Sequence, residues 1–466
     1  MEGYRELTQI SVVGLGKLGA PLVAVLASKG FEVVGVDRVP LRVSALRAGR
    51  APVMEPGLQD LLTRSLGRID ATTEIKSAIA TSEVTFVVVP TPSGSDGTFS
   101  TACVISVVRE IGSALRSKVG YHLVVIASTV MPGSTGGPIC QVLETSSGRH
   151  VGSDVGLCYN PGFIALGSVI NDVLRPDFVL IGESDARAGN LLVSVYERIC
   201  DNSPHIQRMN FVNAEIAKMS VNAFVTGKIS FSNMVSDICD RLPGADANTV
   251  LKAVGCDTRI GDKYLSPALG YGGPCFPRDN AAFASMARRV GTQADFVEAT
   301  DAINKRQPAR VISLVRKLLP RGTVGVLGLS YKPATTVIEE SQGLAIALQL
   351  AAAGYRVIAY DPQASDTDKS VLRGKVEIMA QAAACAEMAD LLIIATPWPA
   401  FKHIPLEVFR RSNGPMFVID CWRMLPANFA DVVDLIYLGK YRLHWSQASA
   451  AISIDRPKNP TRGSKS

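Results

Sequence analysis

A short apolar strand that runs directly into a glycine-rich turn is the feature that most constrains how this chain can fold. Residues Gln9–Val13 lead into Gly14-Leu15-Gly16-Lys17-Leu18-Gly19, a helix-forming stretch, Ala20–Ser28, follows, and a second strand, Phe31–Val36, ends at Asp37. Between a strand and a helix, glycines allow a tight turn and the close approach of a pyrophosphate, whose charge meets the helix N-terminus. This order predicts a Rossmann fold that binds a dinucleotide.

Polar residues at the ends of the strands extend the expected cofactor site. Asp37 can accept hydrogen bonds from adenosine ribose hydroxyls, which favours NAD over NADP, although the adjacent Arg38 weakens that preference. Strands at Val84–Val89 and Leu123–Ala127 end in hydroxyl-bearing segments at the edge where ligands of open parallel sheets gather, although such hydroxyls are equally common as turn formers. The expected NAD contacts are Gly14, Gly16, Lys17, Leu18, Gly19, Asp37, Thr91 and Thr129.

The C-terminal part of the chain repeats this arrangement. An apolar strand, Thr323–Leu327, runs into Gly328, and the segment Gly354–Asp361 echoes Gly30–Asp37. We expect a second Rossmann-like unit that faces the first across a helical middle. Because the turn at Gly328 lacks the full glycine fingerprint, a mononucleotide is its expected ligand.

Length and composition set the domain plan. A chain of 466 residues is too long for one compact core, and 47% hydrophobic with 19% charged residues is typical of a soluble globular protein. We predict an α/β protein with two Rossmann-like doubly wound domains joined by a central helical domain with one long helix. The expected boundaries are residues 1–208, 209–318 and 319–454, followed by a basic, disordered tail over 455–466.

The same composition argues against several classes of protein. A net charge of +6 is mild for this length, so nucleic acid is not the expected partner. The first residues lack the pattern of a signal peptide and no apolar run reaches membrane-spanning length, which predicts a cytoplasmic protein without membrane contact. Nine cysteines occur without Cys-x-x-Cys pairs or a matching histidine set, so we expect neither disulfides nor a metal site.

The predicted long helix, Asn213 to about Ile238, carries a stripe of polar residues. They recur at intervals of three, four, four and seven residues, and are Glu215, Lys218, Asn222, Thr226 and Asn233. A solvated stripe would explain this pattern, but flanking apolar residues such as Ile216 and Phe224 favour dry surroundings. Because a lysine in such surroundings is costly unless something polar faces it, the stripe predicts a functional site.

A loop rich in glycine and proline displays one cysteine. Residues 270–279 read Gly-Tyr-Gly-Gly-Pro-Cys-Phe-Pro-Arg-Asp, so that Cys275 sits in a rigid loop whose backbone can approach a ligand closely. Taken alone, a glycine turn with one of nine cysteines is the simpler interpretation. This segment belongs to a longer loop, from Thr258 to Asp279, which also holds the cations Arg259 and Lys263.

Five motifs in this order resemble those of a known family. They are the glycine fingerprint, Ser128-Thr129-Val130, Asn213-Ala214-Glu215 with Lys218 and Asn222, Gly272-Gly273-Pro274-Cys275-Phe276-Pro277-Arg278-Asp279, and Gly328-Leu329-Ser330-Tyr331-Lys332-Pro333. From Gln9 to Leu438 the chain resembles the UDP-glucose/GDP-mannose dehydrogenase family, and the ordered combination is far more specific than any one motif.

This resemblance implies oxidation of a nucleotide-sugar primary alcohol at C6 to a carboxylate, with two NAD used per turnover. Cys275 would trap the aldehyde as a thiohemiacetal, which a second hydride transfer turns into a thioester, and Lys218, Asn222, Asp279 and Thr129 match the polar cluster around C6. An ammonium group at Lys218 would favour the Cys275 thiolate. The expected substrate contacts are Phe163, Lys218, Asn222, Arg259, Tyr271, Gly272 and Lys332.

The resemblance also implies the partners. A UDP-linked hexose or N-acetylhexosamine is preferred over GDP-mannose as the substrate. Relatives pair through the long central helix, so a homodimer is expected.

Departures from the family pattern affect the last step. Where the family commonly has Asn-Pro-Glu-Phe, with the glutamate assigned to thioester hydrolysis, this chain has Gly162, which cannot take a proton from water. Leu166 cannot substitute, and Glu339 and Arg278 stand where an arginine and a lysine are usual. Three hypotheses remain: a complete dehydrogenase in which another group such as Asp279 replaces the glutamate, an enzyme that stops at the aldehyde or thioester, and a nucleotide-sugar-binding protein without turnover.

Overall fold

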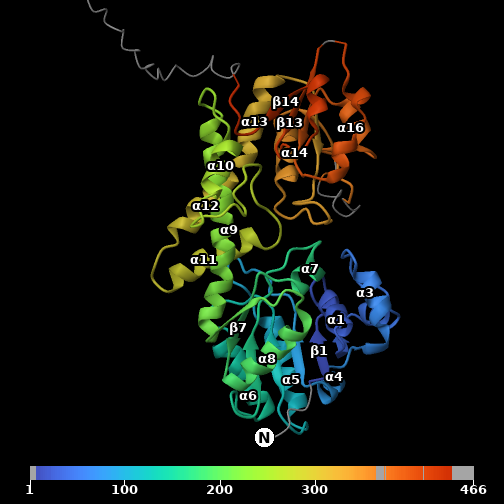
Figure 1. Cartoon of the computed structure of the whole chain (residues 1–466), viewed down its shortest axis with the longest axis vertical. Coiled ribbons are helices and arrows are strands. Elements are labelled where there is room, and N and C mark those ends of the chain that lie inside the picture. Colours follow the sequence, from blue (N-terminus) through green and yellow to red (C-terminus); the bar gives the residue numbers. More distant parts are fainter. Residues whose placement is uncertain (1–6, 364–371, 373, 413, 443–466) are drawn as a thin grey trace, which may run out of the picture.

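Two β-sheets, one near each end of the molecule, are linked by the long helix α9, Phe211–Cys239 (Figure 1). The computed structural model describes residues 7–363, 372, 374–412 and 414–442. The predicted tail over 455–466 lies outside the described residues. The predicted α/β class, with two sheets and a central helical region that includes one long helix, is confirmed.

The N-terminal sheet has eight strands in the order β3-β2-β1-β4-β5-β6-β7-β8. All neighbours pair in parallel except β6 and β7, which are antiparallel. The order reverses between β1 and β4, which is where ligands of such sheets bind. The strands are β1 Gln9–Val13, β2 Glu32–Val36, β3 Ile69–Thr72, β4 Val84–Val87, β5 Leu123–Ile126, β6 Gly156–Tyr159, β7 Phe178–Glu183 and β8 His205–Met209.

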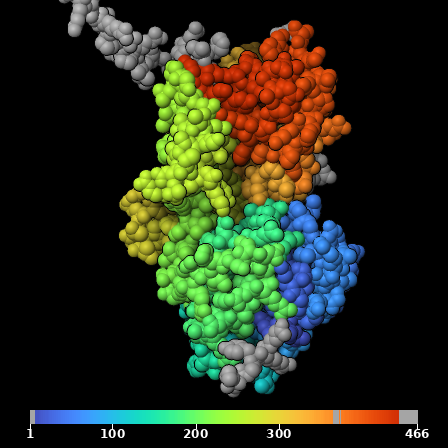
Figure 2. Space-filling view, in the orientation of Figure 1, coloured from blue at the N-terminus to red at the C-terminus, as the bar shows by residue number. Residues whose placement is uncertain are grey.

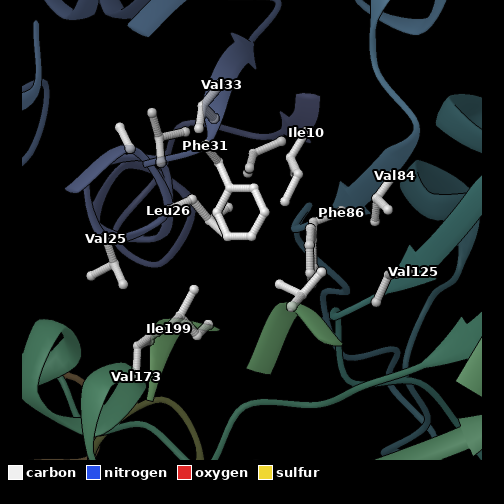
Figure 3. Close-up of a cluster of buried hydrophobic side chains, with 14 of the residues drawn as sticks. Ile10, Val25, Leu26, Phe31, Val33, Val84, Phe86, Val125, Val173 and Ile199 are labelled. Carbon is white, nitrogen blue, oxygen red and sulfur yellow. The ribbon is translucent and has the colours of Figure 1, made fainter. Parts of the chain in front are cut away.

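Helices cover this sheet and enclose its core. Figure 3 shows the Phe31 ring among Ile10, Leu26 and Phe86, between α1 and the sheet. Phe31 is only 1% exposed, so its truncation to alanine should cost about 3–5 kcal/mol. The helices are α1 Gly19–Ser28, α2 Pro40–Arg47, α3 Leu58–Ser65, α4 Ile75–Thr81, α5 Ala102–Leu115, α6 Cys140–Ser147, α7 Val169–Leu174 and α8 Ala186–Ile199, with the short turns η1 Leu66–Arg68 and η2 Thr135–Ile139.

The central region is helical and is built on α9. Its start is fixed by Asn210, whose side chain accepts a hydrogen bond from the Asn213 N–H at 3.0 Å. The expected helix over 213–238 is therefore slightly longer in the structure. Around it lie α10 Ala247–Gly255, α11 Phe276–Arg289, α12 Asp295–Lys305 and α13 Gln307–Leu318.

The C-terminal sheet has six parallel strands in the order β11-β10-β9-β12-β13-β14. The two folds share an equivalent hydrogen bond at the turn after their first strand. Asp37 accepts it from the Leu15 N–H at 2.8 Å, and Asp361 accepts it from the Leu329 N–H at the same distance. The elements are β9 Thr323–Leu327, α14 Gln342–Ala352, β10 Arg356–Tyr360, β11 Glu377–Ile378, α16 Ala382–Met388, β12 Leu391–Ile394, η3 Pro399–His403, η4 Leu406–Phe409, β13 Met416–Asp420, η5 Ala427–Asp431 and β14 Val433–Tyr437.

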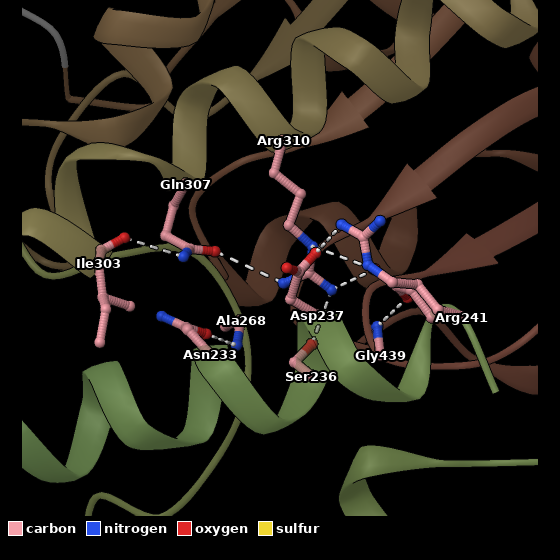
Figure 4. A network of polar contacts seen from close by, with 10 residues as sticks. Asn233, Ser236, Asp237, Arg241, Ala268, Ile303, Gln307, Arg310 and Gly439 are labelled. Atoms are coloured by element: carbon pink, nitrogen blue, oxygen red, sulfur yellow. Dashed lines mark hydrogen bonds and ion pairs between the residues drawn. The ribbon is translucent and has the colours of Figure 1, made fainter. Parts of the chain in front are cut away.

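Asp240, the residue that follows α9, joins this helix both to α13 and to the C-terminal fold. Arg310 of α13 reaches α9, where its guanidinium bonds to Asp240 and, at 2.9 Å, to the Ser236 hydroxyl (Figure 4). Asp240 also accepts a hydrogen bond from the Gly439 N–H at 2.7 Å, just after β14. Both charged side chains are nearly buried, with 13% of Arg310 and 10% of Asp240 exposed. The Gly439 bond therefore ties the end of the C-terminal sheet to the end of α9, and Arg310 neutralises the charge of the carboxylate that accepts it.

The two folds also meet directly. Figure 2 shows orange residues of the C-terminal lobe against the blue-green surface of the N-terminal lobe. At one such contact, a Cβ on Gly167 would lie 2.9 Å from the Ala334 carbonyl oxygen. Within the described ranges, no helix is long and apolar enough to cross a membrane, and no group of three or more His, Cys, Asp or Glu side chains is arranged to hold a metal ion.

Candidate active site

The glycine turn after β1 has the geometry that a pyrophosphate needs. Gly14 has a φ of +102°, and a Cβ there would lie 2.3 Å from the Val88 carbonyl oxygen. A Cβ on Gly19 would lie 1.7 Å from the Gly14 carbonyl oxygen, so α1 packs directly on the turn. Around Gly16 nothing lies within 4 Å, while Lys17 and Leu18 are exposed beside it. The turn is therefore tight on the protein side and open on the side where a dinucleotide would bind.

Asp37 is held at this turn, as an NAD-binding acid should be. Its side chain is buried, and its carboxylate accepts hydrogen bonds from the N–H groups of Leu15 at 2.8 Å and Val39 at 2.9 Å. The cation that reaches it is Arg42, at 3.2 Å, whereas the exposed Arg38 is the one that the sequence suggested. The residues present fit an NAD.

Thr91 and Thr129 lie at the carboxyl ends of β4 and β5 and are bonded to each other. The Thr91 hydroxyl donates to the Thr129 carbonyl oxygen at 2.7 Å, and Thr91 is buried. This bond holds the two strand ends together at the edge of the dinucleotide site.

The polar stripe on α9 is buried along its whole length, and each of its residues has a partner in another segment. Glu215 accepts hydrogen bonds from the N–H groups of Gly133 and Thr135 at 2.6 and 2.8 Å. Farther along, Thr226 bonds to Asn280, and Asn233 bonds to the backbone of Ala268 and Leu269. The stripe thus fastens both the N-terminal sheet and the cysteine loop to α9.

The apolar residues of α9 lie on the other side, and many of them are exposed. Phe224 is 64% exposed, and Ile216, Phe231, Met234 and Ile238 are exposed as well. The expectation that Ile216 and Phe224 would surround the stripe was therefore wrong, because they point away from it. The stripe is shielded from solvent because residues of the N-terminal domain and of the cysteine loop pack over it.

The glycines of the cysteine loop are needed for contacts within the protein. A Cβ on Gly270 would lie 2.2 Å from Asn304 Oδ1, and one on Gly272 would lie 2.1 Å from the Glu340 carbonyl oxygen. Gly273 has a φ of +81° and packs against the Tyr331 ring, 2.5 Å from where its Cβ would be. The sequence suggested close approach to a ligand, whereas these glycines let the loop pack against α12 and the C-terminal fold.

Cys275 is the residue that precedes α11. The residue as a whole is exposed to solvent, while its thiol group is partly buried. Burial of the thiol raises its pKa above the usual value, and the neighbouring Asp279 carboxylate raises it further. Arg278 and Lys218 lower the pKa, as expected for nearby cations, but their effect is outweighed. The expectation that Lys218 would favour the thiolate is therefore right in direction, while the net shift favours the thiol.

Lys218 points from α9 to the loop after β6. Its ammonium donates to the Gly162 carbonyl oxygen at 2.7 Å and lies 4.4 Å from the centre of the Phe163 ring. Burial lowers the pKa of Lys218, and the Asp279 carboxylate and Cys275 act in the opposite direction. A buried lysine with a lowered pKa is suited to proton transfer.

Asp279 lies between Asn222 of α9 and Arg278, which was not among the expected site residues. It is 2% exposed, and one carboxylate oxygen accepts a hydrogen bond from the Asn222 amide at 2.6 Å. The other oxygen has no hydrogen-bond donor among the residues that the structure describes and lies 3.5 Å from the Arg278 Nε. Arg278 also donates to the Thr91 carbonyl oxygen at 3.2 Å and lies over the Phe99 ring. Arg278 thereby connects the cysteine loop to the cofactor edge.

The other expected substrate residues are divided between the site and the surface. Lys332 is half-buried close to Cys275, and burial lowers its pKa while Asp172, Glu55 and Cys275 oppose the shift. Tyr271 is buried, and its hydroxyl is bonded to Asp301. Arg259 pairs with Asp257 of its own loop at 2.6 Å, and 86% of its side chain is exposed. The structure thus brings Lys332 to the cluster and does not bring Arg259 there.

Three segments of the chain match domains of the UDP-glucose/GDP-mannose dehydrogenase family. The NAD binding domain matches residues 8–200, the central domain residues 212–306 and the UDP binding domain residues 325–427. A UDP-glucose 6-dehydrogenase of Haloferax volcanii is 34% identical over 404 residues, which are 86% of this chain and 93% of that protein. A GDP-mannose 6-dehydrogenase of Pseudomonas aeruginosa is 32% identical over 357 residues, which are 76% and 81% of the two chains. The structure of a UDP-glucose dehydrogenase from the archaeon Pyrobaculum islandicum superposes with a TM-score of 0.85 at 32% identity, covering 95% of this chain and 99% of that one.

Proposed function

The chain belongs to the UDP-glucose/GDP-mannose dehydrogenase family, and from that premise we propose that it oxidises the C6 primary alcohol of a UDP-sugar to the carboxylate. The observation that carries this proposal is the convergence of Lys218, Asn222 and Asp279 from two helices around Cys275. When bound, NAD would accept the hydride that leaves C6, one NAD for the alcohol and a second for the thiohemiacetal, whose oxidation gives the thioester. The glycine turn at Gly14 and the edge at Thr91 would hold it.

Lys218 is the general base for the alcohol. Its lowered pKa lets it take the C6 hydroxyl proton, and its bond to the Gly162 carbonyl oxygen fixes the position of its nitrogen. Once the aldehyde has formed, the Cys275 sulfur bonds to C6 and its proton goes to the aldehyde oxygen, which gives a thiohemiacetal. Asn222 and the cations Lys218 and Arg278 stabilise negative charge on that oxygen during the addition.

Release of the product requires a water molecule close to Cys275. Asp279 has one carboxylate oxygen fixed by Asn222, while the other can accept a hydrogen bond from water. In this role Asp279 positions the water that attacks the thioester, and the attack gives the sugar acid and frees the thiol.

The C-terminal fold supplies the nucleotide contacts. It matches the UDP binding domain of the family, and Lys332 brings a cation from it to the cysteine site, where it suits a diphosphate. A UDP-glucose or UDP-N-acetylhexosamine substrate fits this arrangement. Two of the relatives named above act on UDP-glucose and the third acts on GDP-mannose, which the panel assay below includes.

One alternative is that the enzyme stops before the acid, and Gly162 favours it. A glycine offers no group that could take a proton from water at this position. A Cβ there would meet only the Ile164 side chain, at 2.7 Å from its tip, so a glutamate could be accommodated by a rotamer change. If hydrolysis is impaired, Gly162→Glu should raise the output of acid.

A panel assay tests these alternatives. The protein is incubated with NAD and UDP-glucose, UDP-N-acetylhexosamines or GDP-mannose, and both NADH and product mass are followed. Two NADH per sugar with free uronate supports the proposal, whereas an adduct on Cys275 or a free aldehyde supports the arrested enzyme. If Cys275→Ser changes neither product formation nor ligand affinity, the protein is a binder without turnover.

A homodimer through α9 completes the proposal. The exposed side chains Phe224, Phe231 and Ile238 form an apolar face along the helix, and such faces usually mark protein contacts. Phe231→Glu should shift the protein from dimer to monomer in sedimentation velocity. A monomeric wild-type protein at micromolar concentration would contradict the dimer.

A further inference from the structure

One exposed carboxylate lies beside Cys275 and has no part in the chemistry described so far. We propose that Glu339, in the segment between β9 and α14, accepts the proton of the water that releases the sugar acid from Cys275. This role rests on the proposed function, because it concerns the last step of the same reaction.

The backbone places Glu339 beside the cysteine loop. The Gly273 N–H donates to the Glu339 carbonyl oxygen at 3.0 Å, and Gly272 packs against the carbonyl of the next residue, Glu340. Glu339 itself lies in a turn that is closed by a bond from the Ser341 N–H to the Ile338 carbonyl oxygen at 3.1 Å. The carboxylate is close enough to the thiol that its charge raises the pKa of Cys275.

Asp279 and Glu339, the two carboxylates whose charge acts on Cys275, differ in burial and are therefore suited to different roles. Asp279 is 2% exposed, bonded to Asn222 and close to Arg278, which suits a group that orients a water molecule. Glu339 is exposed, and its side chain has no hydrogen bond or ion pair to any residue in the described part of the chain. A group with access to solvent can take up a proton and pass it to bulk water, whereas a buried carboxylate cannot do so readily.

The step balances without a further reactant. The water oxygen bonds to the thioester carbon, the carbon–sulfur bond breaks, and Cys275 leaves as a thiolate. Glu339 takes one proton of the water, and the second passes to the thiolate as the sugar acid ionises. No electrons are transferred in this step, so it is a hydrolysis.

The test compares Glu339→Gln with Glu340→Gln. Glu340 is the matched control, because it is the adjacent exposed glutamate and its contact with Gly272 is made by its backbone. With NAD and UDP-glucose, Glu339→Gln should form two NADH per Cys275 in a burst and then slow at least about 100-fold, which is the usual contribution of a general base. Intact-protein mass should show the uronyl adduct on Cys275, since a slowed hydrolysis makes the acyl-enzyme accumulate. Glu340→Gln should turn over like the wild-type protein.

The outcomes distinguish failure of the proposed role of Glu339 from failure of the proposed function. If the wild-type protein forms uronate and Glu339→Gln forms it at the same rate, the role of Glu339 is refuted while the proposed function stands. If the wild-type protein forms no uronate from any sugar of the panel, the proposed function fails, and the role of Glu339 fails with it. If Glu339→Gln loses the NADH burst as well, Glu339 acts before hydrolysis and the proposal is overturned. Recovery of turnover by adding Gly162→Glu to Glu339→Gln would support the missing base as the cause.

Discussion

Replacing Gly273 with alanine should displace Cys275 and lower kcat by more than the loss of stability alone would explain. A residue other than glycine at φ +81° costs about 1–2 kcal/mol in backbone strain. In addition, the new Cβ would lie 2.5, 2.6 and 2.9 Å from three atoms of the Tyr331 ring, where carbon atoms in contact need about 3.5–4.0 Å. The loop or the ring must therefore move by about 1 Å. Since a misplacement of that size costs about 100-fold in rate, kcat should fall by roughly that factor.

Gly291 provides the matched control, because it follows the other end of the same helix. Its φ is +80°, and no atom lies within 4 Å of where its Cβ would be. Gly291→Ala should thus have the same backbone strain and lower the stability by a similar amount, with little change in kcat. Stability is measured by urea unfolding and kcat by NADH formation with UDP-glucose. If Gly273→Ala and Gly291→Ala have kcat values within twofold of each other, packing of the loop on Tyr331 does not position Cys275.

Two further predictions concern charge. Because Asp279 raises the pKa of Cys275 and Arg278 lowers it, Asp279→Asn should move the pH profile of Cys275 alkylation by iodoacetamide to lower pH, and Arg278→Met should move it to higher pH; equal profiles would contradict the assignment. Arg310→Met leaves Asp240 as an unpaired buried carboxylate and should cost about 3–5 kcal/mol in urea unfolding. Burial already raises the pKa of Asp240 in the folded protein, so the folded state holds that proton more tightly than the unfolded state, and the loss should grow as pH rises. Adding Asp240→Asn should recover most of the loss, and failure to do so would show that the charge is not the cause.

Local sequence patterns were sufficient to predict the two Rossmann folds. The strands Gln9–Val13 and Thr323–Leu327 lie where the hydrophobic pattern placed them, and Asp37 and Asp361 accept equivalent hydrogen bonds from the turns that follow these strands. These features depend on residues that are neighbours in the chain or in one strand–turn–helix unit. The antiparallel strand β7 was not expected, because its pairing with β6 depends on how the chain returns to the sheet.

The candidate site was predictable only in part, since its geometry depends on contacts between distant segments. The helical period showed that Lys218 and Asn222 share a face, but it did not show that this face meets Gly162 and Asp279. The apolar character of Phe224 was read as a sign of burial nearby, whereas the residue is exposed on the opposite face. Periodicity identifies faces without saying what covers them.

On α9 the polar stripe is buried and several apolar side chains are exposed, and this arrangement also affects how the protein folds. Two stripe residues bond to residues far away in the chain, Lys218 to one 56 positions earlier and Asn222 to one 57 positions later. Asp240, which follows the helix, bonds to a residue 199 positions later. Closing such long loops is slow, and helices form much faster than they dock. After dilution from denaturant, helical circular dichroism should therefore return before dehydrogenase activity. We expect the long-range contacts of α9 to form late in folding, and the lag between the two signals would measure their formation.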